Sequence, residues 1–195
     1  MPHLCCDAIP AAAQIVMALQ TLVSRETDPM DSAVVSVTNI QAGSGALNVI
    51  TGDARVSGTC RAFNQRTRES VEARLKAVVE SIAGAYRLTS EISYRPITDP
   101  VVNDPESTKY SQSAAAAIVG EGNVRDFDPI MGAEDFGGFL EARPGAFMII
   151  GQGEPGAASP CNFGLHSPNY DFNDAIIPLA AGYFAELVER RLPLD

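Results

Sequence analysis

The chain has 195 residues, of which 46% are hydrophobic and 19% charged, and its formal net charge is −10. This length suits one large domain or two small ones, and the composition is that of an ordinary globular protein with a substantial core. The acidic balance and the lack of Lys or Arg runs argue against nucleic acid as a partner. No apolar stretch approaches the roughly 20 residues that a membrane span needs, and the first residues lack the pattern of a signal peptide.

The four cysteines, at positions 5, 6, 60 and 161, favour free thiols over a disulfide framework, because two of them are adjacent. We therefore predict a reducing, cytoplasmic environment. The opening letters PHLCCD also suggest a metal clamp. However, zinc-binding cysteines are usually separated by two or more residues, so Cys5 and Cys6 are better explained as buried residues at the start of a helix.

Hydrophobic periodicity in the first hundred residues predicts an α-β-β-α-β order. The expected elements are a helix over 8–23 capped by Asp7, a strand over 32–40, a strand over 54–63, an amphipathic helix over 64–87 and a strand over 88–96. A ferredoxin-like unit has the order β-α-β-β-α-β, so its first strand is missing here.

The second half of the chain predicts a different unit. Prolines at positions 96, 100 and 105 mark a turn-rich boundary, which predicts domains over 1–98 and 99–195. Beyond it we expect a helix over 107–120, a loop with a short helix over 129–145, a buried strand over 146–153 and a last helix over 174–192. The fold class is therefore α/β.

Three groups of residues are candidates for a functional site. His166 lies in the polar turn GLHSPNYDFND after a glycine-rich strand end, where sites collect in α/β folds, although a lone histidine is more often a hydrogen-bonded structural residue than a ligand. Glu134 and Asp135, in MGAEDF, are open to two interpretations, a helix cap or a contact with a cation or substrate amide. Asn48 and Arg61 are donors suited to a carboxylate, although Arg61 alone is more typical of a surface ion pair.

Four motifs in this order, the opening residues 1–50, GTCRAF, MGAEDF and LHSPNYDFND, resemble the metal-dependent amidohydrolases of the aminoacylase and carboxypeptidase type. The most similar branch is that of hippurate hydrolase, N-acyl-amino-acid amidohydrolase and indole-acetyl-amino-acid hydrolase. The resemblance implies an α+β, ferredoxin-like lid without its first strand, followed by the C-terminal part of an α/β catalytic domain. Family members carry an earlier segment with most metal ligands and a Glu-Glu pair, and we expect this segment to be absent here.

The resemblance also implies roles for single residues. His166 matches a metal-ligand histidine, and Glu134 and Asp135 match an acidic loop that lines the active site. Asn48 and Arg61 match lid residues that bind the substrate carboxylate, often in the site of a neighbouring subunit.

Two further residues belong to the part that resembles the lid. His3 matches the second histidine of a lid motif that contacts substrate, and only the end of that motif is present. Thr51 stands where a proline is usual, in the loop that holds Asn48, so we expect a change in that loop.

The activity that the resemblance implies is hydrolysis of the amide bond of a small N-acyl amino acid. In the complete enzyme, divalent zinc, manganese or cobalt lowers the pKa of a water molecule and a glutamate takes its proton. A zinc site needs about three protein ligands. We therefore expect this chain alone to lack most ligands and the general base, to bind metal weakly and to have little activity.

The expected partners are a second copy of the chain through the lid and a separate N-terminal half. Two alternatives to the hydrolase fragment remain open at this point. One is a non-catalytic dimerisation or interaction module, a remnant of a split or truncated enzyme. The other is a binder of acyl amino acids that uses Asn48 and Arg61 without hydrolysis. An incomplete sheet also predicts exposed apolar surface and self-association.

Overall fold

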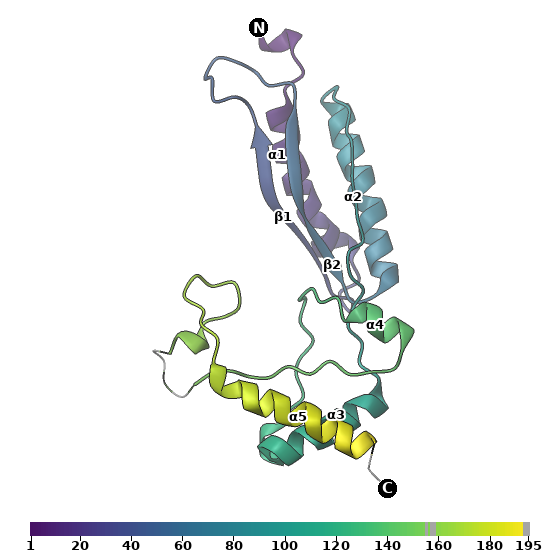
Figure 1. Ribbon diagram of the computed structural model, residues 1–195. Helices are drawn as coiled ribbons and strands as arrows, with labels where there is room; N and C mark the ends of the chain where they lie inside the picture. The colour runs from purple at the N-terminus through teal and green to yellow at the C-terminus, as the bar shows by residue number, and fades with distance from the viewer. Residues whose placement is uncertain (155, 157–158, 193–195) are drawn as a thin grey trace. The chain divides into compact units, whose positions relative to one another are not determined.

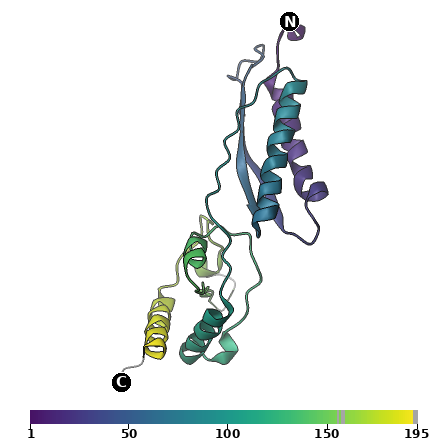
Figure 2. The same cartoon turned by 90° about the vertical axis from the view of Figure 1, so that its right-hand side faces the viewer.

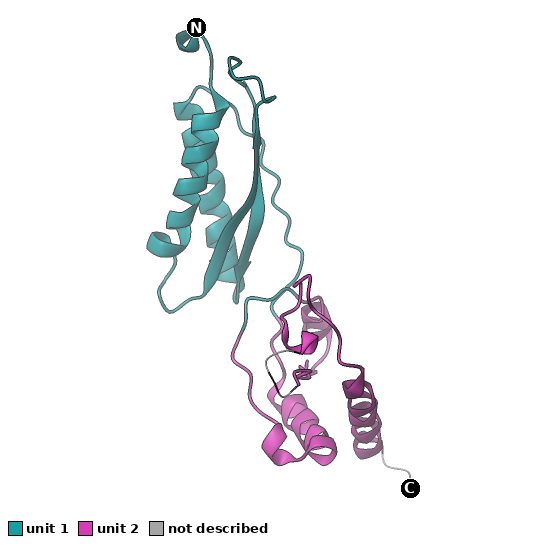
Figure 3. Cartoon of the chain, turned by 90° about the vertical axis from the view of Figure 1, so that its left-hand side faces the viewer, with its two compact units in different colours: residues 1–100, 130–133 teal, residues 101–129, 134–195 magenta. Residues whose placement is uncertain are grey.

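The computed structural model describes residues 1–154, 156 and 159–192. The chain divides into two compact units, the first made of Met1–Pro100 with Ile130–Ala133 and the second of Val101–Pro129 with Glu134–Asp195 (Figure 3). The division falls in the proline-rich passage where the sequence places a boundary. That these units correspond to a lid and a catalytic part stays a prediction.

The first unit is a two-stranded sheet covered on one face by two helices (Figures 1 and 2). Its elements in chain order are the 3-10 turn Pro2–Leu4, α1 Ala8–Thr21, the π-helical turn Leu22–Glu26, β1 Ala33–Ala42, β2 Ala54–Ala62 and α2 Gln65–Ala85. The two predicted helices and the two predicted strands of the hairpin are thereby confirmed.

Side-chain caps explain where the two long helices begin. Asp7 accepts a hydrogen bond from the Ile9 N–H at 3.0 Å, and Asn64 accepts one from the Thr67 N–H at 2.8 Å. Each cap satisfies a donor that has no partner within its own helix. At the other end of α2, Arg87 has a positive φ of 61° and the chain turns away sharply.

The hairpin is antiparallel, with Ala33 opposite Ala62 and Ala42 opposite Ala54. Its register shifts between Val37 and Asn39, which is a β-bulge. Gly58 lies opposite the bulge, where a Cβ would overlap the carbonyl oxygen of Ser36. Only glycine allows the two backbones to approach this closely.

The core of the first unit joins both helices to the sheet. Leu19 of α1, Leu22, Val35 of β1 and Val71 of α2 form one buried cluster, in which Leu22 is 1% exposed. Half-buried apolar side chains of both helices pack around it. The apolar stripe predicted for residues 64–87 therefore faces the sheet.

The predicted strand over 88–96 is not present as a strand. The segment follows α2 and has no hydrogen-bonded partner strand among the residues that the structure describes. The alternating sequence pattern predicts an extended segment with one buried face. A β-strand also requires hydrogen bonds to a neighbouring backbone, and the alternation of side chains does not predict whether such a neighbour is present.

The second unit is built from helices and loops. Its elements are α3 Pro105–Val119, the 3-10 turn Glu121–Asn123, α4 Gly137–Ala142, the 3-10 turns Pro160–Asn162 and Asp174–Ile176, and α5 Ile177–Arg191. Asp104 caps α3 by accepting a hydrogen bond from the Ser107 N–H at 2.8 Å. Gly120 ends that helix with a φ of 83°, as the sequence predicts.

The buried strand expected over 146–153 is also wrong. Nowhere in the described part of the second unit is there a strand, and Ile149 and Ile150 are exposed. The expected α/β class therefore becomes a mixed fold of helices with one small sheet. None of the described helices has both the length and the apolar character of a membrane span.

Candidate functional site

The first unit carries three of the predicted site residues, each in a different local setting. His3 lies in the turn Pro2–Leu4 and is exposed. Asn48 is exposed in the loop over residues 43–53 that joins β1 to β2. Arg61 is half-buried near the end of β2.

The register of the hairpin separates Asn48 from Arg61. Arg61 lies opposite Val34, where β1 begins, whereas Asn48 belongs to the loop at the other end. The strand from Ala54 to Arg61 spans about 23 Å at about 3.3 Å per residue. The two donors therefore do not grip one carboxylate within this unit. The role of each residue as a substrate contact stays a prediction.

Thr51 fixes the loop that carries Asn48. The Thr51 carbonyl accepts a hydrogen bond from the Ala8 N–H at 3.2 Å, at the start of α1. The Thr51 hydroxyl donates to the Asp53 carbonyl at 3.1 Å. The backbone hydrogen bond between Thr51 and Ala8 thus fixes the position of this loop at the first turn of α1. The hydrogen bond of the Thr51 hydroxyl stabilises only the local turn.

Glu134 and Asp135 lie at the start of α4 in the second unit. Glu134 is half-buried, and its carboxylate accepts a hydrogen bond from the Phe136 N–H at 3.3 Å. Asp135 is exposed, and its backbone carbonyl accepts from the Gly138 N–H at 3.1 Å. Glu134 therefore bonds to the backbone just before α4, a helix without a side-chain cap, whereas the Asp135 side chain is exposed; the role of both residues in a site stays a prediction.

His166 lies at the tip of a loop in a backbone conformation that side chains rarely adopt. Its φ is 70°, and it is exposed. The turn around it is closed by a hydrogen bond from the Ser167 N–H to the Gly164 carbonyl at 3.1 Å. A non-glycine residue in the left-handed region costs about 1 kcal/mol, and such residues concentrate at ligand-binding sites.

Gln152 is the residue that holds the base of the His166 loop together, and sequence analysis missed it. Its amide nitrogen donates to the carbonyls of Cys161 and Asp171, both at 3.2 Å. Its amide oxygen accepts from the Tyr170 hydroxyl at 3.1 Å, and its backbone carbonyl accepts from the Asn173 side chain at 3.0 Å. One side chain thereby connects three points of residues 161–173.

Asn162 has a similar role on the other side of this loop. Its side-chain oxygen accepts from the Glu154 N–H at 2.9 Å, and its side-chain nitrogen donates to the carbonyls of Glu154 and Gly156 at 3.0 and 2.6 Å. The sequence predicts the roles of Gln152 and Asn162 only weakly. Their hydrogen-bond partners are backbone groups, which every residue type has, so the identity of the neighbouring residues does not reveal them.

The described residues do not form a metal site by themselves. No group of three or more His, Cys, Asp or Glu side chains in residues 1–154, 156 and 159–192 is arranged to hold an ion. His166, Glu134 and Asp135 are therefore not a ligand set, and neither are His3, Cys5, Cys6 and Asp7. All four cysteines lie in the described chain and are free. We assign no catalytic step to a metal held by these residues alone.

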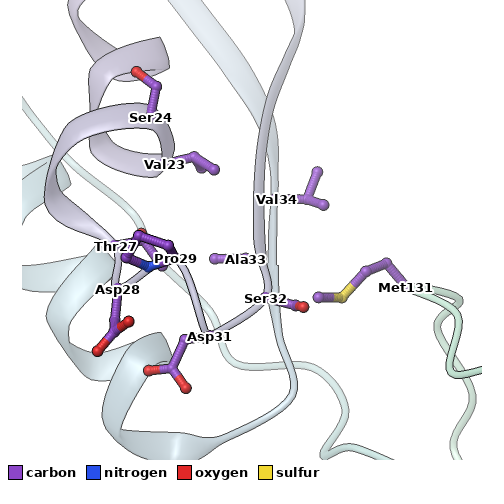
Figure 4. A pocket seen from close by; sticks show the side chains of 10 residues that line it. All are labelled: Val23, Ser24, Thr27, Asp28, Pro29, Asp31, Ser32, Ala33, Val34 and Met131. Atoms are coloured by element: carbon purple, nitrogen blue, oxygen red, sulfur yellow. The ribbon is translucent and has the colours of Figure 1, made fainter.

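A cavity of about 380 Å³ in the first unit is not a predicted site either. It lies at the turn before β1, and the Met131 side chain points toward Ser32 and Val34 there (Figure 4). Asp31, one of its two acidic residues, accepts hydrogen bonds from the Thr67 hydroxyl at 2.8 Å and from the Asn64 side chain at 3.3 Å. These polar groups join the turn to α2, which is a structural role.

The clear titration shifts lie at structural positions. The hydrogen bond from Arg74 lowers the pKa of Glu26, and the Ser107 backbone N–H lowers the pKa of Asp104 at the start of α3. Burial raises the pKa of Cys60 and of Tyr94. Perturbed pKa values often mark active sites, but each of these has a local cause in an ion pair, a cap or burial.

Comparison with known proteins decides the family. The model of peptidase family M20/M25/M40 matches residues 7–190. The chain belongs to this family. The resemblance drawn from the four sequence motifs is thereby confirmed.

Relatives of this M20-family chain are named as hydrolases. It is 32% identical to "IAA-amino acid hydrolase ILR1-like 4" of Arabidopsis thaliana, over 98% of this chain and 44% of the relative. It is also 32% identical to "Hippurate hydrolase" of Campylobacter jejuni, over 95% of this chain and 47% of the relative.

A solved structure supports the fold. The crystal structure of a dinuclear metal binding peptidase of the M20 family from Bacillus subtilis aligns with a TM-score of 0.71 and 30% identity, over 97% of this chain and 47% of that chain. The M20-family chain thus spans less than half the length of these relatives.

Proposed function

We propose that this chain is part of a metal-dependent amidohydrolase that cleaves the amide bond of small N-acyl amino acids. The observation that carries the proposal is the family match over residues 7–190, together with relatives named as hippurate hydrolase and IAA-amino acid hydrolase. Both names describe hydrolysis of an amino acid joined to an acyl group.

In this proposal the first unit is the lid, a ferredoxin-like unit without one strand, and the second is the C-terminal part of the catalytic domain. His166 supplies one metal ligand from an exposed loop that Gln152 and Asn162 brace. Asp135 presents a carboxylate to solvent beside α4. The bound metal ions would supply an activated water molecule, and the described residues hold no complete site for them.

Asn48 and Arg61 act as separate substrate contacts in this proposal. Because they lie at opposite ends of the hairpin, one substrate carboxylate meets only one of them from a given lid. The guanidinium of Arg61 suits a carboxylate through two parallel hydrogen bonds. Asn48, on an exposed loop, is accessible to a site on a second copy of the chain.

A chimera tests the proposed function. The part of the Campylobacter hippurate hydrolase that this chain does not span would be fused to the full chain and assayed against hippurate and other N-acyl amino acids with zinc, manganese or cobalt. We expect turnover that falls about 100-fold or more with His166→Ala, and an exposed control on α3, Lys109→Ala, should lose much less. A chimera that melts cooperatively but hydrolyses no N-acyl amino acid would overturn the proposal.

The isolated chain gives the complementary measurement. We expect less than one tightly bound metal ion per chain and no turnover, because His166 lacks partner ligands among the described residues. Turnover together with two bound ions would refute the proposed incompleteness of the site and leave the family assignment intact.

A further inference from the structure

The adjacent pair Cys5 and Cys6 has no role in the proposed hydrolysis. Both residues are half-buried, so each keeps contact with solvent, and both thiols are free. The pair precedes residues 7–190, which match the family model, so that match assigns nothing to it. A cysteine thiolate is a strong ligand for soft metal ions, and two of them side by side form a ligand pair.

The backbone that carries the pair is fixed on both sides of Cys5. The Cys5 N–H donates to the Pro2 carbonyl at 3.2 Å, and the Cys5 carbonyl accepts a hydrogen bond from the Arg87 guanidinium at 2.9 Å. Cys5 itself is extended, with a φ of −108° and a ψ of 155°. Its thiol makes a weak hydrogen bond to the Met1 carbonyl at 3.6 Å. The backbone therefore holds the pair in place, while the Cys5 sulfur is bound only weakly.

A disulfide within the pair does not fit this geometry. Neighbouring Cα atoms are about 3.8 Å apart across a trans peptide bond, whereas cysteines in a disulfide have Cα atoms about 4.4–6.8 Å apart. In extended backbone, moreover, successive side chains leave the chain on opposite sides. We therefore expect Cys5 and Cys6 to stay as thiols that are available to a ligand.

The number of ligands decides which metal ion the pair suits. A structural zinc ion takes about four ligands, and an iron–sulfur cluster takes about four thiolates. His3 and Asp7 do not join the pair in a group of three or more ligands in the part of the chain that the structure describes. Two thiolates alone suit a soft ion of low coordination number, and Cu(I) is an ion that thiolates select.

A linear arrangement of sulfur, copper and sulfur suits adjacent residues better than a direct bond between the two sulfur atoms. Two metal–sulfur bonds of about 2.3 Å, the length found in zinc thiolates, place the sulfur atoms about 4.6 Å apart. Rotation of each side chain about χ1 between its staggered positions adjusts the spacing of the sulfur atoms. The two thiolates thus approach one ion from two sides.

We propose that Cys5 and Cys6 bind one Cu(I) ion as a two-coordinate dithiolate. Two copper–sulfur bonds form, and each thiol gives up its proton, so that two protons pass to solvent for each ion bound. The ion keeps its oxidation state, and no oxidant or reductant takes part.

The bound ion would also restrain the loop that carries Asn48. The chain continues from Cys6 into α1, where the Ala8 N–H donates to the Thr51 carbonyl of that loop at 3.2 Å. The first residues and the loop over residues 43–53 lie at the same end of the first unit (Figures 1 and 2). An ion that fixes Cys5 and Cys6 therefore acts on this loop through two covalent neighbours and one hydrogen bond.

This inference does not depend on amide hydrolysis. Neither His166 nor the acidic residues Glu134 and Asp135 are ligands in it, and its measurements are made on the binding of copper alone. A failure of the copper site is therefore distinguishable from a failure of the proposed function.

Copper titration of the full chain tests the site. The probe is Cu(I) alone, transferred to the reduced chain without oxygen from a coloured Cu(I) chelator, and we expect one ion per chain. Loss of a group that only supports a ligand costs about 10–100-fold in metal affinity, so Cys5→Ser or Cys6→Ser should cost about 100-fold or more. Cys161→Ser removes another half-buried free thiol and should bind as the unchanged chain does.

Proton release by the unchanged chain gives a readout that needs no variant. At pH 6, binding should release about two protons per ion, because both thiols lose theirs. Release of one proton, equal weakening by Cys161→Ser, or zinc bound as tightly as Cu(I) would each overturn the two-thiolate site. One ion for two chains, with the mass of a dimer in light scattering, would overturn it as well, because the two thiols of one chain would then not share the ion.

Hydrogen–deuterium exchange tests the connection to the loop. With one Cu(I) bound, we expect exchange over residues 43–53 to slow about threefold or more, with no change over 177–191. The same copper added to Cys6→Ser should leave the loop unchanged. Copper binding without protection of the loop would overturn the connection through Ala8.

Discussion

The two units of this chain are stabilised in different ways. The first has an apolar core in which Leu22 and Val35 are buried between helices and sheet. In the second, the described buried residues are small, namely Ser111, Ala114 and Gly137, while Phe184 of α5 is 63% exposed. The second unit instead packs α3 against α5 and Phe136 against Phe139 and Phe147, and amide side chains form hydrogen bonds to its loop backbone.

This difference also distinguishes the surroundings of the two candidate residues Arg61 and His166. In the first unit, Arg61 projects from a strand of regular geometry, and packing fixes that strand. In the second, His166 stands on a loop with a positive φ, and its position depends on a network of hydrogen bonds centred on Gln152. Removal of packing should therefore affect the first unit most, and removal of one amide the second.

The largest effect is expected from Leu22→Ala. Leu22 is 1% exposed, and loss of a buried leucine costs about 2–5 kcal/mol of unfolding free energy through lost transfer and a residual cavity. Urea unfolding, followed by exchange in each unit, should show the loss in residues 1–100 alone. Leu179→Ala on α5 is the control, because Leu179 is 42% exposed and should cost under about 1 kcal/mol. Equal losses would show that the cluster around Leu22 is not the core.

Gln152→Ala is expected to have the next largest effect, confined to the second unit. It removes hydrogen bonds to the carbonyls of Cys161 and Asp171 and from Tyr170, so the local opening free energy of residues 159–174 should fall by about 1–3 kcal/mol. Exchange in this loop should quicken while residues 1–100 stay unchanged. Gln112→Ala, which removes one surface bond to Asp126, is the control. An unchanged loop would refute the bracing role of Gln152.

The hydrophobic pattern predicted much of the first unit because its elements are local. Caps at Asp7 and Asn64 and the apolar stripe of α2 identify where helices begin and which face they bury. The segments over 88–96 and 146–153 were predicted as strands and are not, because pairing depends on a neighbour that lies elsewhere in the sequence. An alternating pattern of apolar and polar side chains predicts only that one face of the segment is buried, not that its backbone is paired.

The candidate site was harder to predict from sequence than the fold. Residue types identified His166 and Arg61, but the register of the hairpin places Arg61 about 23 Å from the end that carries Asn48. The Gln152 network could not be predicted at all, since its partners are carbonyl groups common to every residue. Single candidate residues can thus be proposed from sequence, whereas the contacts that hold them in place need coordinates.

A smaller effect is expected from pH in the first unit. The folded pKa values of Cys60 and Tyr94 are raised by burial, so folding favours their protonated forms. This stabilisation is fully present below the unfolded cysteine pKa of about 8.5 and is lost as pH rises through the folded values. Discounted for partial exposure, the loss should stay below about 1 kcal/mol. Urea unfolding between pH 7 and 10 should show it.

The matched variant for this pH effect is Cys60→Val. It removes the thiol, so the decline in unfolding free energy should begin only near the ordinary tyrosine pKa of about 10. A decline that begins at the same pH in both proteins would assign it to groups other than Cys60.

The smallest effect is expected from Thr51→Val. The Thr51 hydroxyl donates to the Asp53 carbonyl, but the loop is held mainly by the Thr51 carbonyl, which accepts from the Ala8 N–H and is unaffected by the substitution. The unfolding free energy should change by no more than about 0.5 kcal/mol, and exchange over residues 43–53 should quicken only slightly. A backbone contact to a packed helix thus fixes the Asn48 loop, whereas a side-chain amide fixes the His166 loop. If Thr51→Val instead opened its loop as much as Gln152→Ala opens the other, both loops would depend on side-chain hydrogen bonds, and the contrast between the two units would be confined to their cores.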